Sequence, residues 1–142
     1  MEQNEINNNQ VITFKEGIPG FEDLTKFILL EEEEGVFLYL QSIENKNIAF
    51  PILDPYLIKE DYAPNINESY FEKLGGGKTE EFTLFTIATI KSNVGESTIN
   101  LQAPLLIHTD RRIGVQAIVE DKIYMTRHKI ADLIKERGAR EC

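Results

Sequence analysis

The sequence predicts a single, mostly β domain, a small antiparallel β-barrel or sandwich-like fold with one or two short helices and a C-terminal amphipathic helix. Its 142 residues suit one domain, and 42% hydrophobic with 27% charged residues is typical of a globular protein. About eight or nine short segments rich in β-branched and aromatic residues alternate with turn residues. Apolar residues recur at helical spacing in few places, so we expect few helices.

Composition also divides the chain into three parts. Residues 1–10 are rich in asparagine and glutamine and have no apolar period, which predicts a flexible N-terminus. The β domain is expected over residues 11–128. Residues 129–142 are expected to form a helical extension, because Ile130 and Leu133 fall on one face of a helix.

Turn residues bound the strands of the first half. These strands are expected at residues 11–14, 27–30, 36–42 and 48–53. A single helical turn is expected over residues 21–27, after the glycines that end the first strand. The acidic run 31–34 with Gly35 predicts the turn of a hairpin. Pro51 lacks an N–H, so its strand is expected to lie at an edge of the sheet or to end at the proline.

The second half combines one short helix with further strands. The helix is expected over residues 67–74, ended by Gly75, Gly76 and Gly77, which adopt positive φ without penalty. The strands are expected at residues 81–91, 98–103, 105–107, 113–119 and 123–125, with a hairpin turn at 120–122. In the C-terminal extension, Gly138 is expected to end the helix.

The distribution of charge along the sequence indicates which classes of partner the protein is expected to bind. The net charge is −9, and residues 1–82 carry six basic against 17 acidic side chains, whereas residues 83–142 carry nine against seven. Nucleic-acid affinity comes largely from lysine and arginine on phosphates, so direct nucleic-acid binding is not expected. An acidic surface attracts basic proteins, and beside another protein's RNA-binding face it would repel the RNA.

The sequence offers no catalytic, metal or cofactor site. His108 and His128 stand 20 residues apart without neighbouring ligands, and the single cysteine is Cys142. Residues 75–79 resemble a phosphate-binding loop, but the first glycine of that motif would fall on Glu72. No apolar run is long enough for a membrane span, and the first residues lack the layout of a signal peptide, so a cytoplasmic protein is expected. These features favour a binding module over an enzyme.

Several segments, taken in order, resemble the FliW family of flagellar assembly factors. They are residues 14–22, 37–44, 49–55, 99–107 and 114–116, with Tyr124 and Arg127–His128 near the end. The resemblance implies a small β-barrel-like protein without catalysis, which binds two cytoplasmic proteins in alternation. One is flagellin before export, for which such a protein acts as a chaperone. The other is the translational repressor CsrA, which the family member sequesters when it is free of flagellin, so that flagellin mRNA is translated.

Partner contacts are expected at three places, and the protein is expected to be a monomer on its own. The candidate residues are Glu31, Glu32, Glu33 and Glu34 for attraction of the basic CsrA, then Asp54, Pro55 and Tyr56 on an irregular segment, then Ala103 and Pro104. Pro104 interrupts a ladder, and the unpaired edge there is expected to accept a flagellin segment. The alternative is a small β-barrel that binds a ligand in its mouth, which would need polar groups pointing inward.

Overall fold

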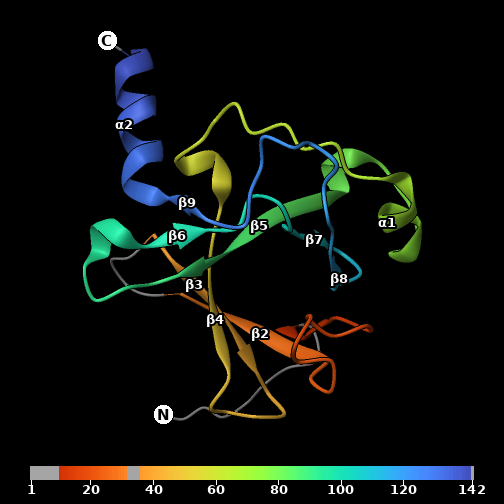
Figure 1. Cartoon of the computed structure of the whole chain (residues 1–142). Coiled ribbons are helices and arrows are strands. Elements are labelled where there is room, and N and C mark those ends of the chain that lie inside the picture. Colours follow the sequence, from red (N-terminus) through yellow and green to blue (C-terminus); the bar gives the residue numbers. More distant parts are fainter. Residues whose placement is uncertain (1–9, 32–35, 142) are drawn as a thin grey trace.

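The computed structural model describes residues 10–31 and 36–141, and it is a closed β-barrel flanked by two helices (Figure 1). The barrel strands are β1 Ile12–Thr13, β2 Lys26–Glu31, β3 Leu38–Ser42, β4 Ala49–Leu53, β5 Phe82–Thr89, β7 Leu105–His108 and β8 Ile113–Gln116. They follow the order β4-β3-β2-β1-β8-β7-β5, and pairing of β4 with β5 closes the ring. The predicted fold class is confirmed.

All but one of the pairings in the ring are antiparallel. The exception is β1 against β8, which is parallel and registers Thr13 with Ile113. Two short strands, β6 (Thr98–Ile99) and β9 (His128–Lys129), extend the sheet from β5. The named 3-10 turns of the described residues are η2 (Pro55–Leu57), η3 (Thr79–Glu81) and η4 (Val94–Glu96).

Apolar side chains fill the barrel and cover two sides of it. The interior cluster consists of Ile12, Phe14, Ile18, Phe27, Leu40, Ile52, Leu105 and Ile107. On the outside, helix α1 (Glu68–Lys73) brings Leu74 over Leu106 and Val115. Strand β7 is therefore buried on both faces, which explains why it appears in the sequence as a continuous apolar run.

A third cluster lies at the end of the barrel that carries β6 and β9. It joins Leu53, Tyr62, Ala88, Ile99, Leu101, Val119, Tyr124 and Leu133. Leu133 belongs to helix α2 (Ile130–Glu141), so the C-terminal helix packs on this cluster. Figure 1 shows α2 beside η2 and pointing away from the barrel.

Two close approaches require glycine. Gly17 has φ +70°, and a Cβ there would stand 2.5 Å from the Cα of Glu22. Gly114 lies against the ring of Phe14, where a Cβ would approach the ring to 2.8 Å. Both glycines belong to segments on which the family resemblance depends.

Four predicted elements of the second half are wrong or too long. The strand expected at 113–119 ends at Gln116, and residues 117–125 form a loop, so neither the strand at 123–125 nor the hairpin at 120–122 exists. Backbone groups of this loop pair with residues 101 and 102 instead: the N–H of Val119 donates to the carbonyl of Gln102, and the carbonyl of Met125 accepts from the N–H of Leu101. The strand expected at 98–103 keeps only its first two residues.

The first half needs smaller corrections. Residues 21–25 form turns rather than a helical turn, with the N–H of Leu24 donating to the carbonyl of Phe21. Strand β4 continues past Pro51, with β3 on one side and with β5 pairing from Ile52 onward. Most of the acidic run, Glu32, Glu33 and Glu34, lies outside the described residues, as do residues 1–9.

The two expected helices are present, with different ends. Asn67 caps α1 by accepting a hydrogen bond from the N–H of Ser69, and Gly75 follows its end with φ +94°. Helix α2 continues through Gly138 to Glu141, so the expected stop is wrong. One glycine inside a helix costs only about 1 kcal/mol relative to alanine, which packing of the preceding turns offsets.

Candidate functional site

Strand register brings Glu31, the described residue of the acidic run, to the same end of the barrel as the other two groups of predicted contact residues. Glu31 pairs with Leu38, Leu38 with Ile52, and Ile52 with Ile87, so one row across four strands leads from the acidic run to the end of β4. Asp54 follows that end directly. Neighbouring strands lie about 4.8 Å apart, which places Glu31 roughly 10 Å from the end of β4.

Neighbouring positions of β4, β5 and β7 lead to the third group. Leu53 pairs with Thr86, and Phe85 pairs with Leu105, the residue that follows Pro104. Separate segments that were chosen from the sequence for unrelated reasons therefore meet at one end of the fold. We call this end of the barrel the β4 end.

The corner after β4 presents an aromatic side chain. Asp54 accepts a hydrogen bond from the N–H of Tyr56 at 2.9 Å and so starts η2, with Pro55 buried beneath. The ring of Tyr56 remains 40% exposed and leans on the ring of Tyr62, with 5.8 Å between centroids. We call residues 54–61 the η2 corner.

Beside this corner the surface is hollowed into a groove of about 460 Å³, which we call the Tyr56 groove. It is lined by Tyr56, Tyr62, Ala63, Pro64, Ile66, Phe71, Thr79, Phe82, Leu84 and Leu106. The lining comes from six segments: η2, the loop after it, α1, η3 and the barrel strands β5 and β7. Its size and apolar lining suit the side chains of a protein segment or a small molecule.

Most of the groove was not predicted from the sequence. Tyr56 was predicted, whereas Tyr62, Phe71 and Phe82 were not. Phe71 and Phe82 read as ordinary core residues of a helix and a strand, and only the fold brings their rings to 5.0 Å. For Tyr62 the available signal was a second tyrosine close to Tyr56 in a stretch without any apolar period.

The tyrosines beneath the groove are firmly held. The hydroxyl of Tyr62 donates to the carbonyl of Leu101 at 2.7 Å, and its ring meets that of Tyr124 edge to face at 4.8 Å. The hydroxyl of Tyr124 in turn accepts from the N–H of Ala63. Burial raises the pKa of Tyr62, and burial followed by the charge of Asp54 raises the pKa of Tyr56. Both phenols therefore stay neutral in ordinary conditions.

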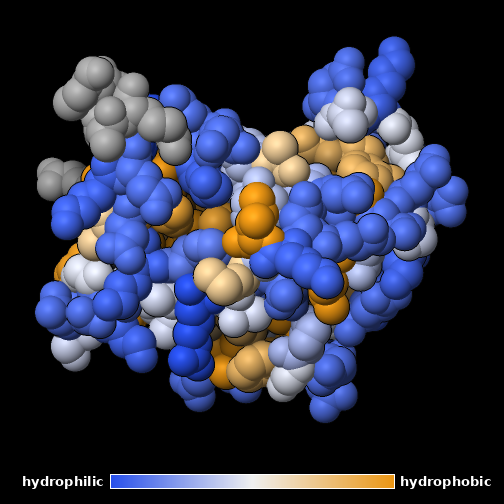
Figure 2. All heavy atoms as spheres, turned by 45° about the horizontal axis from the view of Figure 1, so that its top comes forward, coloured by the Kyte–Doolittle hydropathy of each residue, from blue (hydrophilic) through white to orange (hydrophobic). Residues whose placement is uncertain are grey.

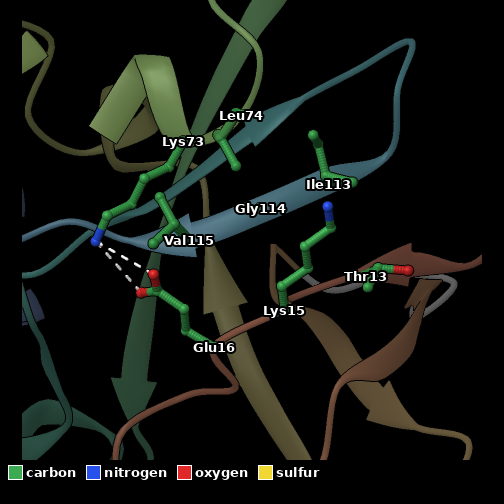
Figure 3. A pocket seen from close by; sticks show the side chains of 8 residues that line it. All are labelled: Thr13, Lys15, Glu16, Lys73, Leu74, Ile113, Gly114 and Val115. Atoms are coloured by element: carbon green, nitrogen blue, oxygen red, sulfur yellow. Dashed lines mark hydrogen bonds and ion pairs between the residues drawn. The ribbon is translucent and has the colours of Figure 1, made fainter. Parts of the chain in front are cut away.

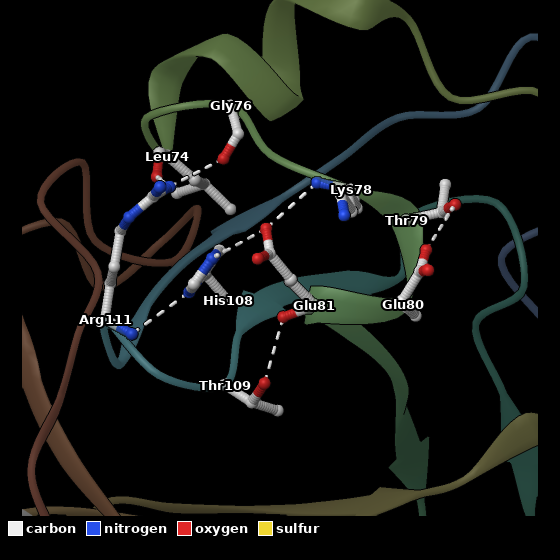
Figure 4. A network of polar contacts seen from close by, with 9 residues as sticks. All are labelled: Leu74, Gly76, Lys78, Thr79, Glu80, Glu81, His108, Thr109 and Arg111. Carbon is white, nitrogen blue, oxygen red and sulfur yellow. Dashed lines mark hydrogen bonds and ion pairs between the residues drawn. The ribbon is translucent and has the colours of Figure 1, made fainter.

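A polar network fixes the opposite wall, where α1 meets the barrel (Figure 4). Arg111 donates from one guanidinium nitrogen to the carbonyls of Leu74 at 2.8 Å and Gly76 at 2.6 Å. The backbone N–H of Arg111 donates to Nδ1 of His108, which is only 3% exposed. Nε2 of His108 faces Oε1 of Glu81 at 3.6 Å, and Glu81 also accepts from the N–H of Lys78.

A smaller hollow of about 120 Å³ lies on the other side of α1 (Figure 3). Lys73 of α1 reaches across it to Glu16, with 3.3 Å between Nζ and Oε2, while Lys15 also lines it. Both partners of the ion pair are about half exposed, so the pair adds little stability. Its role is to tie the end of α1 to the segment after β1.

The remaining predicted contacts have little surface to offer. Pro104 is buried, and its carbonyl accepts from the N–H of Ala117 at 2.9 Å. The carbonyl of Ala103 accepts from the side chain of Gln116, and its N–H donates to Asn100. The unpaired edge expected at Pro104 is therefore absent, because the loop after β8 continues the pairing without regular strand geometry.

The barrel interior has little room for a ligand, which the alternative interpretation requires. The interior hollow near Leu29, Phe85 and Arg112 measures about 150 Å³, below the roughly 300 Å³ at which small-molecule sites begin. Within residues 10–31 and 36–141 no group of three or more histidine, cysteine, aspartate or glutamate side chains has the arrangement of a metal site. No helix in this part of the chain is long and apolar enough to cross a bilayer.

The surface around the site mixes charge with isolated apolar side chains. Figure 2 turns the top of Figure 1 toward the viewer and shows hydrophobic patches separated by hydrophilic side chains. Exposed apolar residues near the site include Leu57 in η2, half exposed, and Ile134 in α2. Acidic side chains of Asp54, Glu60 and Asp61 accompany them on the η2 corner.

His128 gives the site a testable pH dependence. Its Nε2 accepts from the N–H of Met125 at 2.8 Å, which requires the neutral ring. Burial lowers the pKa of His128, the charge of Lys59 lowers it further, and Glu136 opposes them. The folded state therefore binds the proton less tightly than the unfolded state, whose histidine pKa is about 6.5. Stability is complete above that pH and falls as the pH drops below it.

We expect the unfolding free energy of the unaltered protein to fall more than that of His128→Gln between about pH 7.5 and pH 5.5. The amide oxygen of glutamine keeps an acceptor for Met125 but does not titrate. Urea unfolding at both pH values measures the difference. The two proteins differ only at residue 128. Parallel pH profiles of their unfolding free energies would therefore show that His128 does not contribute to the pH dependence of stability.

Comparison with known proteins agrees with the fold and the segments described. The family model for the FliW protein matches residues 1–130. The flagellar assembly factor FliW of Caldicellulosiruptor saccharolyticus is 37% identical over 124 residues, covering 87% of this chain and 82% of the relative. The factor of the same name from Clostridium tetani is 40% identical over 121 residues, covering 84% and 83%.

A solved structure agrees as well. A crystal structure of the flagellar assembly factor FliW superposes with a TM-score of 0.83 at 30% identity and covers 89% of each chain. Sequence and three-dimensional similarity thus extend over nearly the whole barrel. This chain belongs to the FliW family of flagellar assembly factors.

Proposed function

We propose that this protein is a non-enzymatic, cytoplasmic flagellar assembly factor that switches between two protein partners. It binds flagellin before export, and when free of flagellin it sequesters the translational repressor CsrA, so that flagellin mRNA is translated. Alone it is a monomer. The observation that carries the proposal is that Glu31, the first residue of the acidic run, lies two strands from the end of β4, where the η2 corner and the Tyr56 groove are.

Flagellin is assigned to the Tyr56 groove and the exposed residues beside it. An apolar groove with a half-exposed aromatic residue at its rim has the composition of a protein-binding hot spot. The tyrosines under the groove are hydrogen-bonded, so the surface is formed before a partner arrives.

CsrA is assigned to the acidic side of the same end. A repressor that holds RNA needs basic residues, which the surplus of acidic groups in residues 1–82 attracts. Glu31 ends β2 with its side chain exposed, at the start of the run that continues through Glu32, Glu33 and Glu34. The same charge repels RNA held by CsrA.

The short distance between the two proposed binding surfaces explains why flagellin and CsrA would exclude each other. Glu31 lies only two strands away from the end of β4, whereas a specific protein interface covers about 800 Å² on each partner. Two proteins of ordinary size placed at these points would overlap. Occupancy by flagellin therefore releases CsrA, and loss of flagellin permits its capture.

The test is a titration of the purified protein with flagellin and with CsrA, separately and in competition, at low and high salt. We expect both to bind, each to displace the other, and salt to weaken CsrA more strongly than flagellin. Changing Glu31, Glu32, Glu33 and Glu34 to glutamine should weaken CsrA and reduce its salt dependence while flagellin affinity stays the same.

Three results would contradict the proposal. Simultaneous binding of both partners in one complex would exclude the switch. Unaltered CsrA affinity and RNA displacement after the glutamine changes would remove the acidic run as the cause. A failure of both partners to bind would refute the assignment as a whole.

A further inference from the structure

Helix α2 lies beyond the part of the chain that the family model matches, yet it is built into the site. The match ends at residue 130, where α2 begins. Leu133 is only 5% exposed and belongs to the same apolar cluster as Tyr62 and Tyr124, the tyrosines beneath the Tyr56 groove. The N–H of Ile130 donates to the carbonyl of Ser97, which fixes the start of the helix.

Two turns after its start, α2 contacts the η2 corner through Arg137. One guanidinium nitrogen donates to the carbonyl of Leu57, and another lies 3.5 Å from a carboxylate oxygen of Glu60. Leu57 is the last residue of η2, and the final carbonyls of a helical turn have no partner within it. Arg137 supplies that partner and places positive charge where the negative end of the turn favours it.

The η2 corner is otherwise tied together by short-range bonds. The N–H of Leu57 donates to the carbonyl of Asp54, and those of Ile58 and Lys59 both donate to that of Pro55. Lys59 also pairs with Asp61 at 3.2 Å. Buried Pro55 and partly buried Ile58 seat one side of the corner on the barrel, whereas these bonds leave the carbonyl of Leu57 and the carboxylate of Glu60, on the side facing α2, to Arg137. The contact from Arg137 connects the corner to a helix that is anchored in the third apolar cluster.

We propose that α2 is a strut and that Arg137 is a positioning residue, which holds the η2 corner and the exposed ring of Tyr56 in the geometry that binds flagellin. A corner ordered before binding loses less conformational entropy when the partner arrives, so the strut raises affinity without touching the partner. The affinity part rests on the function proposed above, whereas the ordering of the corner does not.

The experiment compares Arg137→Ala, Arg137→Lys and the control Lys135→Ala in the full chain. Lys135 is exposed on the same helix and therefore tests the loss of one positive charge alone. Amide hydrogen exchange over residues 56–61 reports the order of the corner, and calorimetric titration with purified flagellin reports affinity. Thermal unfolding checks that Leu133 keeps α2 in place.

For Arg137→Ala we expect exchange over residues 56–61 to accelerate about tenfold and flagellin affinity to fall about three- to tenfold, with little change in melting temperature. Arg137→Lys should restore part of both effects, since lysine still donates to Leu57 but does not form the planar fork of a guanidinium. Lys135→Ala should match the unaltered protein in both measurements.

Unchanged exchange in Arg137→Ala would overturn the strut. Faster exchange with unchanged flagellin affinity would overturn the positioning role, because the corner would then bind equally well when loosened. If the unaltered protein itself failed to bind flagellin, the proposed function and the affinity effect would both fall, while exchange would still decide whether Arg137 orders the corner.

Discussion

Alanine in place of Gly17 is expected to lower the free energy of unfolding by about 3 kcal/mol, the largest effect that we predict for a single methyl group in this protein. Two costs add. The backbone φ of +70° lies in the left-handed region, and the new Cβ would stand 2.5 Å from the Cα and 2.8 Å from the carbonyl oxygen of Glu22. Both of these are backbone atoms, so no side-chain rotation relieves the contact. Urea unfolding measures the loss.

Gly20 provides a matched control in the next turn along the chain. Its φ of +91° is also positive, but a Cβ there would meet nothing within 4 Å. Gly20→Ala should therefore lower the free energy of unfolding only by the cost of a positive φ for alanine, about 1 kcal/mol. Equal losses in the two variants would show that the approach of Gly17 to Glu22 is not a source of stability.

Tyr56→Ala is expected to weaken flagellin binding about 30-fold, equivalent to about 2 kcal/mol. The ring is 40% exposed at the rim of an apolar groove and leans on the fixed ring of Tyr62, so it offers contact area at low entropic cost. Because the ring is only partly buried, the change should cost little stability. Titration with flagellin and a urea unfolding curve measure the two effects.

Ile43→Ala is the matched control for the Tyr56 variant. Ile43 is 37% exposed in the turn between β3 and β4, at the end of these strands that lies opposite the η2 corner (Figure 1). It should bind flagellin like the unaltered protein. Equal weakening by both changes, or by neither, would contradict the placement of flagellin at the Tyr56 groove.

The strands of the first half could be predicted because each is rich in β-branched, aromatic or other apolar residues and is bounded by strong turn residues. The loop at residues 117–125 misled the prediction for a physical reason. Val119 and Tyr124 are buried, which gives the segment the apolar residues of a strand, but its N–H groups bond to carbonyls of an irregular neighbour. The pattern of hydrophobic residues predicts which side chains are buried, but it does not predict which backbone groups form hydrogen bonds with each other.

Site residues could be predicted from the sequence only where a single short segment has a recognisable local pattern. Asp54, Pro55 and Tyr56 form a turn with an exposed aromatic residue, and the structure places them at the groove. The walls of the groove come from segments far apart in sequence, so no local pattern announces them. Arg137 gave no signal either, since a positive residue near the end of a helix is common for electrostatic reasons alone.

The parallel pairing of β1 with β8 has a consequence for how the chain folds. Thr13 and Ile113 are separated by roughly 100 residues, so this contact carries one of the larger loop-closure costs in the protein. The antiparallel β2-β3-β4 meander, whose contacts are local, forms early, whereas the ring stays open until β8 is available. During synthesis, barrel closure therefore waits until Ile113 has left the ribosome. Phe14 and Phe27 remain without the β7 residues that cover them in the finished core until Leu105–His108, just ahead of β8 in the chain, has emerged.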